Sequence, residues 1–143
     1  MNRSLALLVF ASAAACGSET GSSIGTKNFA NFQGLPAWTG TVRTTETCPG
    51  SPASSVDSQF SFILGGASGA DLQYASTAGC LFQFNISGNI ASLANAPFSC
   101  STSTWTTYTL TTANGHSLNL AAAGTDTSSG QTCQFTQTGN LTR

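Results

Sequence analysis

The sequence predicts an all-β domain, an eight-stranded antiparallel up-and-down β-barrel, behind an N-terminal export signal. Short stretches of alternating apolar and polar residues recur along the chain, separated by clusters of Gly, Asn and Asp. Thr and Ser are abundant, and Thr favours pleated, half-exposed surfaces. No convincing helical period follows the leader. A two-sheet β-sandwich is the alternative architecture.

The leader has the organisation of a secretory signal peptide. Arg3 supplies a positive charge, and residues 5–11 form an apolar run far shorter than the ~20 residues that span a bilayer. Small residues then precede Cys16. The stretch resembles the lipobox of bacterial lipoproteins, in which a cysteine directly after the cleavage site is lipidated, although Ala13 stands where that family usually has Leu. Ordinary cleavage that leaves Cys16 unmodified is the alternative.

The chain divides into three parts. Residues 1–15 are the predicted signal peptide, residues 16–34 contain the lipidated cysteine and a flexible tether, and residues 35–143 form the barrel domain. Within the tether, the spacing of Phe29 and Phe32 predicts one helical turn that caps an open end of the barrel, with an irregular apolar plug as the alternative.

Composition limits the classes of partner. The chain has 143 residues, enough for one domain, of which only 6% are charged, and its formal net charge is −1. Without a basic patch, neither nucleic acid nor an anionic membrane surface is an expected partner. Nine Phe, two Trp and two Tyr are enough to build a core, and we expect a monomer.

The period-2 pattern places each strand and its inward face. The eight strands are predicted at about residues 37–48, 57–65, 70–77, 80–87, 90–96, 104–112, 116–124 and 131–143. The inward rows contain Trp38, Val42, Phe60, Phe62, Leu64, Leu72, Tyr74, Phe82, Phe84, Ile86, Leu93, Tyr108, Leu110, Leu118, Leu120, Phe135 and Leu141.

The turn at residues 113–115 tests the hairpin register. A two-residue turn would place Leu110 and Leu118 on opposite faces of the sheet. A three-residue loop pairs Leu110 with Leu118 and Tyr108 with Leu120, which keeps both apolar rows inside. We therefore predict the three-residue loop.

The turn at residues 77–79 supports the same topology. A three-residue loop there pairs Tyr74 with Phe82 and Leu72 with Phe84. Because the apolar faces of successive hairpins agree, the sequence favours a meander in which each strand pairs with the next.

Closure of the barrel would pair the first strand with the last. If Trp38 lies opposite Arg143, then Cys48 lies opposite Cys133, because the residue numbers of both pairs sum to 181. This register brings two cysteines into bonding range and lays a guanidinium over an indole.

The five cysteines support export. If Cys16 carries lipid, four cysteines remain, and an exported domain of this kind is expected to form two disulfides, with three possible connectivities. The strand pairing predicts Cys48–Cys133 and Cys80–Cys100. No Cys-x-x-Cys pair is present to favour zinc. Cys16 is left without a partner, which favours its lipidation.

Trp38 and Arg143, with Gly40 nearby, resemble a motif of the lipocalin and avidin-like barrels (the calycin group). Those proteins have a Trp near the start of the first strand, on which an Arg near the end of the barrel stacks. The resemblance implies a structural role for this pair, a cation–π contact that closes one end of the barrel. The Gly-x-Trp sequence of that group is absent, since Gly34 lies four residues before Trp38.

No set of residues indicates catalysis. The single histidine, His116, follows a turn, no Gly-x-Ser-x-Gly sequence is present, and no His, Asp and Glu residues have metal-ligand spacing. We expect neither enzymatic activity nor a metal or cofactor.

Binding functions remain open. We expect a barrel filled by its own side chains; a hollow one would carry a small apolar ligand. The possible lining residues are Phe60, Phe62, Tyr74, Phe82, Phe84, Tyr108 and Phe135. Trp105 is predicted to point outward, where it packs against residues 97–103 or anchors an interface.

The predicted function is that of a membrane-anchored extracytoplasmic lipoprotein whose barrel is structural or binds an unknown protein. A carrier of a small apolar ligand and a protease-inhibitor-like module acting through its tether or the loop at residues 49–55 are the alternatives. The lipid on Cys16 would anchor the protein in the cell envelope, in the outer membrane, and a secreted soluble protein is the alternative location.

Overall fold

The computed structural model describes residues 27–127 and 130–143. This part of the chain is all-β apart from one short 3-10 helix, η1 (Phe29–Asn31). The strands are β1 (Trp38–Thr47), β2 (Ser54–Phe62), β3 (Gly65–Gly66), β4 (Leu72–Ala75), β5 (Leu81–Ser87), β6 (Ile90–Leu93), β7 (Phe98–Cys100), β8 (Ser103–Thr111), β9 (Ser117–Asp126) and β10 (Cys133–Thr142). The predicted signal peptide and Cys16 lie outside the described residues.

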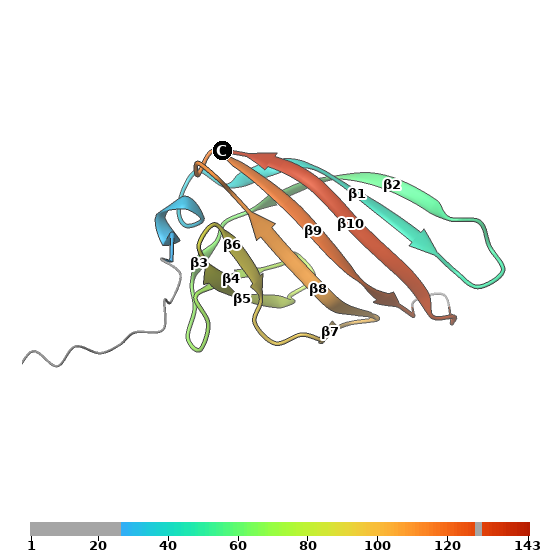
Figure 1. Ribbon diagram of the computed structural model, residues 1–143. Coiled ribbons are helices and arrows are strands. Elements are labelled where there is room, and N and C mark those ends of the chain that lie inside the picture. Colours follow the sequence, from blue (N-terminus) through green and yellow to red (C-terminus); the bar gives the residue numbers. More distant parts are fainter. Residues whose placement is uncertain (1–26, 128–129) are drawn as a thin grey trace, which may run out of the picture.

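The strands form one curled antiparallel sheet in the order β2-β1-β10-β9-β8-β6-β5-β4-β3, with β7 paired only to β8 (Figure 1). The two ends of this order, β2 and β3, are separated along the chain by residues 63 and 64 alone. Because this link is so short, the sheet curls until its two edges meet at residues 63 and 64. Among the described residues no ladder joins β2 to β4, so hydrogen bonds do not complete a barrel. We call this unpaired junction the seam.

The register of the first and last strands is the one that the sequence predicts. The residues paired between β1 and β10, from Thr39 with Thr142 to Thr47 with Gln134, all have numbers that sum to 181. The β4–β5 hairpin also has its predicted register, since Leu72 pairs with Phe84.

The predicted register of the β8–β9 hairpin is wrong by two residues. Leu110 pairs with Leu120 instead of Leu118, so the connecting loop is longer than three residues. The Asn114 side chain stabilises this wider loop, because its Oδ1 accepts hydrogen bonds from backbone N–H groups two and three residues later, at 2.9 and 3.1 Å. A shift of two residues leaves every side chain on its predicted face, since the side-chain period of a strand is two.

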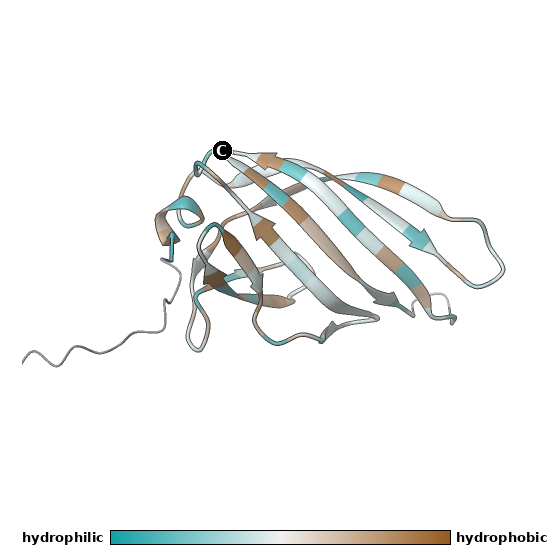
Figure 2. Ribbon diagram, in the orientation of Figure 1, coloured by the Kyte–Doolittle hydropathy of each residue, from teal (hydrophilic) through white to brown (hydrophobic). Residues whose placement is uncertain are grey.

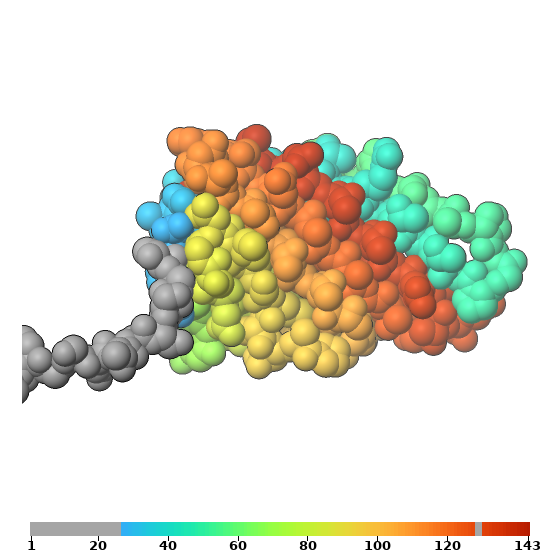
Figure 3. Space-filling model, in the orientation of Figure 1, coloured from blue at the N-terminus to red at the C-terminus, as the bar shows by residue number. Residues whose placement is uncertain are grey.

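The core lies on the inner face of the curled sheet. Apolar and polar residues alternate along the strands (Figure 2), and the buried core residues belong to the apolar rows. The fully buried side chains, each with less than 2% of its surface exposed, are Trp38, Tyr108, Phe32, Phe84, Leu64, Leu72, Leu110, Leu118, Leu141, Val42, Thr112 and Cys133. The β1–β2 hairpin extends beyond the packed part of the domain (Figure 3).

Arg143 and Trp38 close the end of the sheet beside η1. The guanidinium carbon lies 4.4 Å from the centre of the indole ring, and the indole N–H donates to the carbonyl of Phe32 at 2.9 Å. The guanidinium also donates to the carbonyls of Gly115 at 2.7 Å and Gln33 at 2.8 Å. This end is therefore sealed by both apolar packing and backbone hydrogen bonds.

The packed domain begins before residue 35, where the predicted barrel starts. Phe32 is fully buried, as expected of a cap or plug. Lys27 forms an ion pair with Asp71 at 2.8 Å, and Asp71 also accepts a hydrogen bond from the backbone N–H of Ile86 at 2.7 Å. These contacts attach the segment that precedes β1 to β4 and β5.

Both predicted disulfides are formed, Cys48–Cys133 between the ends of β1 and β10, and Cys80–Cys100 between β5 and β7. Disulfides persist in oxidising compartments, so the domain belongs in an extracytoplasmic environment. Over residues 27–127 and 130–143, no helix has the length and apolar character needed to cross a membrane.

Candidate ligand-binding site

An apolar pocket of about 180 Å³ borders the core. It is lined by Phe60, Tyr74, Ser76, Ala78, Cys80, Phe82, Trp105, Tyr108 and Gln137. A larger, shallow depression of about 610 Å³ lies on the outer face of β1, β2, β9 and β10 and contains the exposed Arg43–Asp57 ion pair. The apolar pocket is the better candidate, because convergent aromatic walls are typical of ligand sites.

The aromatic walls of the apolar pocket pack against one another. The ring of Tyr74 stacks between Phe62 and Phe82, with centroid distances of 4.8 and 5.0 Å. Trp105 meets Phe82 edge-on at 4.9 Å, and Tyr108 meets it edge-on at 5.4 Å. These geometries are the favourable ones for aromatic pairs, so the walls have a defined shape.

Two neutral hydroxyl groups lie in this wall. The hydroxyls of Tyr74 and Tyr108 share a hydrogen bond of 2.9 Å. Burial raises the pKa of Tyr74 to about 12, and it also raises the pKa of Tyr108. Both phenols are therefore uncharged over the whole physiological pH range.

The inward position of Trp105 corrects the sequence analysis, which places this side chain outside. A register shift between Trp105 and Thr107 turns the indole onto the same face as Tyr108. Gly124 stands opposite Trp105, and a Cβ there would lie 2.0 Å from the carbonyl oxygen of Thr104. Two large aromatic residues three positions apart, facing a glycine, are a sequence signal that could have indicated this bulge.

Trp105 packs on β7, in agreement with one of the two roles that the sequence suggested. It pairs with Phe98, and their ring centroids lie 6.2 Å apart. Its Nε1 is the one buried side-chain polar atom without a hydrogen-bond partner in the part of the chain that the structure describes. A buried donor without an acceptor costs about 1–3 kcal/mol.

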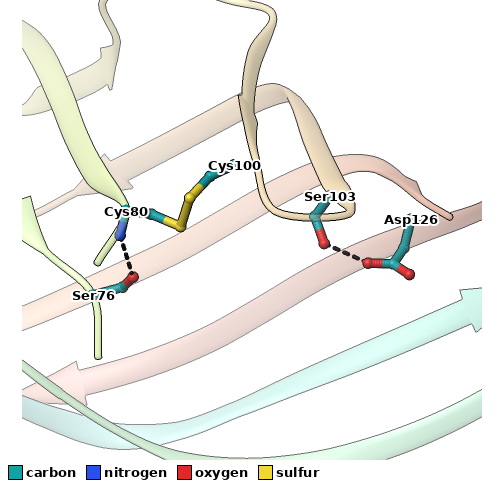
Figure 4. The surroundings of a disulfide bond; sticks show 5 residues. All are labelled: Ser76, Cys80, Cys100, Ser103 and Asp126. Atoms are coloured by element: carbon teal, nitrogen blue, oxygen red, sulfur yellow. Dashed lines mark hydrogen bonds between the residues drawn. A yellow bond between two sulfur atoms is a disulfide. The ribbon is translucent and has the colours of Figure 1, made fainter. Parts of the chain in front are cut away.

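A polar pocket of about 280 Å³ adjoins the apolar one, and the two share Trp105 and Gln137. The polar pocket is lined by Thr44, Glu46, Ser103, Trp105, Asp126, Phe135 and Gln137. Asp126 accepts a hydrogen bond from the hydroxyl of Ser103 in the surroundings of the Cys80–Cys100 disulfide (Figure 4). It accepts a second one from the hydroxyl of Thr102. The Gln137 amide donates to the Thr44 hydroxyl at 3.2 Å.

A groove of about 210 Å³ lies along the seam. It is formed by residues 59–62 of β2 and residues 74–77 at the end of β4. The groove and the apolar pocket share Phe60, Tyr74 and Ser76. The open seam therefore connects the apolar pocket with the surface.

The structure divides the predicted lining residues among these features. Phe60, Tyr74, Phe82 and Tyr108 line the apolar pocket. Phe62 lines the groove, Phe135 lines the polar pocket and Phe84 is fully buried in the core. Trp105 and Gln137 also line both pockets, although the alternating pattern does not predict them there.

Among the residues that the structure describes, one group of side chains has the spacing of metal ligands. Ligand atoms of Glu46, Cys48 and Cys133 lie within 4.8 Å of one another. Both cysteines form a disulfide, so neither offers the thiolate that binds a metal. His116 is exposed in the turn before β9.

Comparisons with protein-family models, with curated proteins and with solved structures gave no significant match. The class of protein is therefore defined by the fold and the site. It is a small, disulfide-linked antiparallel β-domain that is sealed at one end and has an aromatic pocket towards the other.

Proposed function

We propose that the protein binds a small, largely apolar molecule in the apolar pocket. The observation that carries this proposal is the pocket of about 180 Å³ with five aromatic residues among its lining. Apolar cavities of about 150 Å³ bind benzene. The pocket is smaller than the roughly 300 Å³ at which drug-sized ligand sites begin, so it suits a single ring.

The affinity expected from ring burial alone is modest. Roughly 150 Å² of aromatic surface contributes about 4 kcal/mol when buried, which corresponds to a dissociation constant near ~1 mM. Tight binding therefore needs polar contacts beside the ring.

Binding of single-ring probes tests this function. Phenol and indole should produce chemical-shift changes confined to the pocket residues, measured by NMR titration. The variant Ala78→Phe, which fills the pocket from its exposed rim, should lose these changes. The matched control Ala121→Phe adds the same ring to the exposed outer face of β9 and should bind normally. Equal binding by both variants, or no binding by the native protein, would contradict the proposal.

We also propose that the domain is anchored in the cell envelope, in an outer membrane, through lipid on Cys16. The signal-like leader and the two disulfides support this location. Lys27 lies near the sealed end beside η1, so an anchor in the preceding chain would join the domain at that end (Figure 1). The intact mass of the mature protein tests the anchor, which an unmodified Cys16 would refute.

A second candidate function is the binding of an extended protein segment at the seam. One edge of β2 pairs with β1, and its other edge has no ladder partner among the described residues. Such an edge can accept an added strand, with alternate side chains entering the groove. In a complex formed this way, hydrogen exchange should slow along β2. Slow exchange confined to β4, β5 and β8 would instead indicate a ligand in the apolar pocket.

A further inference from the structure

We propose that the ligand carries a positive charge next to its ring, as in an aromatic alkylammonium ion. This inference rests on the proposed function and specifies the ligand class of the same site. It starts from the two adjoining pockets, one apolar and one polar, which share Trp105 and Gln137. A ligand that fills both pockets needs an apolar group and a polar group within one molecule.

The charge of the polar pocket indicates the sign of the polar group. Glu46 and Asp126 contribute carboxylates to its lining, and neither pocket is lined by Lys or Arg. Asp126 is held by hydroxyl groups of β8 and its preceding turn, so Glu46 is the simpler carboxylate to test. A cation would gain from both carboxylates, whereas an anion would be repelled by them.

The cationic side chains of the described residues are all committed elsewhere. Lys27 pairs with Asp71, and Arg43 pairs with Asp57 on the outer face. Arg143 lies over Trp38 at the sealed end. Residues 27–127 and 130–143 therefore supply no cationic side chain to the lining of this pocket.

The aromatic residues of the polar pocket favour the same kind of ligand. Trp105 and Phe135 line it together with the carboxylates, and their rings lie 5.7 Å apart. Aromatic faces attract ammonium groups, most strongly where water is excluded. The two pockets together complement an aromatic ammonium ion. The apolar pocket accepts the ring, the carboxylates attract the charge, and aromatic faces lie beside both.

Three probes of nearly equal size test the sign of the charge. They are 2-phenylethylammonium, 2-phenylethanol and phenylacetate, measured by isothermal titration calorimetry. The ammonium ion should bind about tenfold more tightly than the alcohol, as expected for a charge-assisted contact. Phenylacetate should bind most weakly, and added salt should reduce the preference for the ammonium ion.

Two variants with the same change in net charge locate the effect. Glu46→Gln should remove most of the preference for the ammonium ion and leave the binding of 2-phenylethanol unchanged. Asp57→Asn, on the outer face, should leave both affinities as in the native protein. Circular dichroism and thermal melting confirm that each variant is folded. If Glu46→Gln does not fold, Asp126→Asn, which neutralises the other carboxylate of the polar pocket, takes its place with the same expected loss of preference.

The outcomes separate this inference from the proposed function. Equal binding of all three probes would overturn the cationic ligand and leave the apolar pocket as a binding site. An equal loss of preference in both variants would also overturn it, since a long-range effect of net charge would then explain the preference. Failure of every probe to bind would instead reject the proposed function itself.

Discussion

The guanidinium carbon of Arg143 lies 4.4 Å from the centre of the Trp38 ring, and the same group donates to five backbone carbonyls. Four of these carbonyls belong to residues 30–33, in and after η1, and the fifth belongs to Gly115. One side chain thus covers the core and satisfies loop carbonyls that no strand pairs. A planar guanidinium suits this task because it presents several donors around a flat, stackable face.

Replacement of Arg143 should weaken the sealed end. We expect Arg143→Ala to lower the free energy of unfolding by about 2–4 kcal/mol, because the cation–π contact and several charged hydrogen bonds are lost together. Urea denaturation measures the change. Arg143→Lys keeps the charge but not the planar fork, so it should recover less than half of the loss. A cost below about 0.5 kcal/mol for Arg143→Ala would show that solvent replaces these contacts.

The two disulfides should differ in their contribution to stability. Cys48–Cys133 joins residues 85 positions apart, and Cys80–Cys100 joins residues 20 positions apart. In the chain-entropy model these loops correspond to about 4.5 and about 3 kcal/mol. Paired Cys→Ala variants, compared by urea denaturation, should therefore rank in that order. The reverse order would indicate that strain or local packing outweighs chain entropy.

Gly124 should be required for the inward position of Trp105. A Cβ at residue 124 would lie 2.0 Å from the Thr104 carbonyl oxygen and 2.8 Å from the Phe135 ring. We expect Gly124→Ala to destabilise the domain by about 1–3 kcal/mol and to alter the tryptophan fluorescence. The matched control is Gly65→Ala, where a Cβ meets nothing within 4 Å. Equal effects of the two substitutions would contradict the close approach at Gly124.

The two tyrosines of the chain should resist ionisation until the fold opens. Burial raises the pKa of Tyr74 to about 12 and also raises the pKa of Tyr108, whereas an unfolded tyrosine ionises near pH ~10. Their contribution to stability is therefore complete below about pH 10 and declines as the pH rises further. Tyrosinate absorbance and circular dichroism should change together in an alkaline titration. Ionisation near pH ~10 with an unchanged fold would show that a phenol is accessible.

The predictions from the sequence succeeded where a strand's alternation decides the result. Trp38, Phe82 and Leu110 are buried, as their positions in the alternating pattern predict. Cys48 pairs with Cys133 because the two cysteines continue the register of β1 and β10. The alternating pattern gave the wrong face for Trp105. A bulge adds one residue to β8 there, so side chains before the bulge point to the face opposite to the one predicted.

Residue alternation and spacing were enough to predict eight of the ten strands, their apolar faces, the pairing of the first and last strands and the connectivity of the cysteines; β3 and β7 were not predicted. These features depend on a period of two and on residue spacing, which are local properties of the chain. Three features became visible only in the folded domain. The seam between β2 and β4 stays open, Trp105 turns inward, and Glu46 lies beside an aromatic pocket. Those relationships depend on how far the sheet curls and on contacts between strands distant along the chain, so alternation alone could not reveal them.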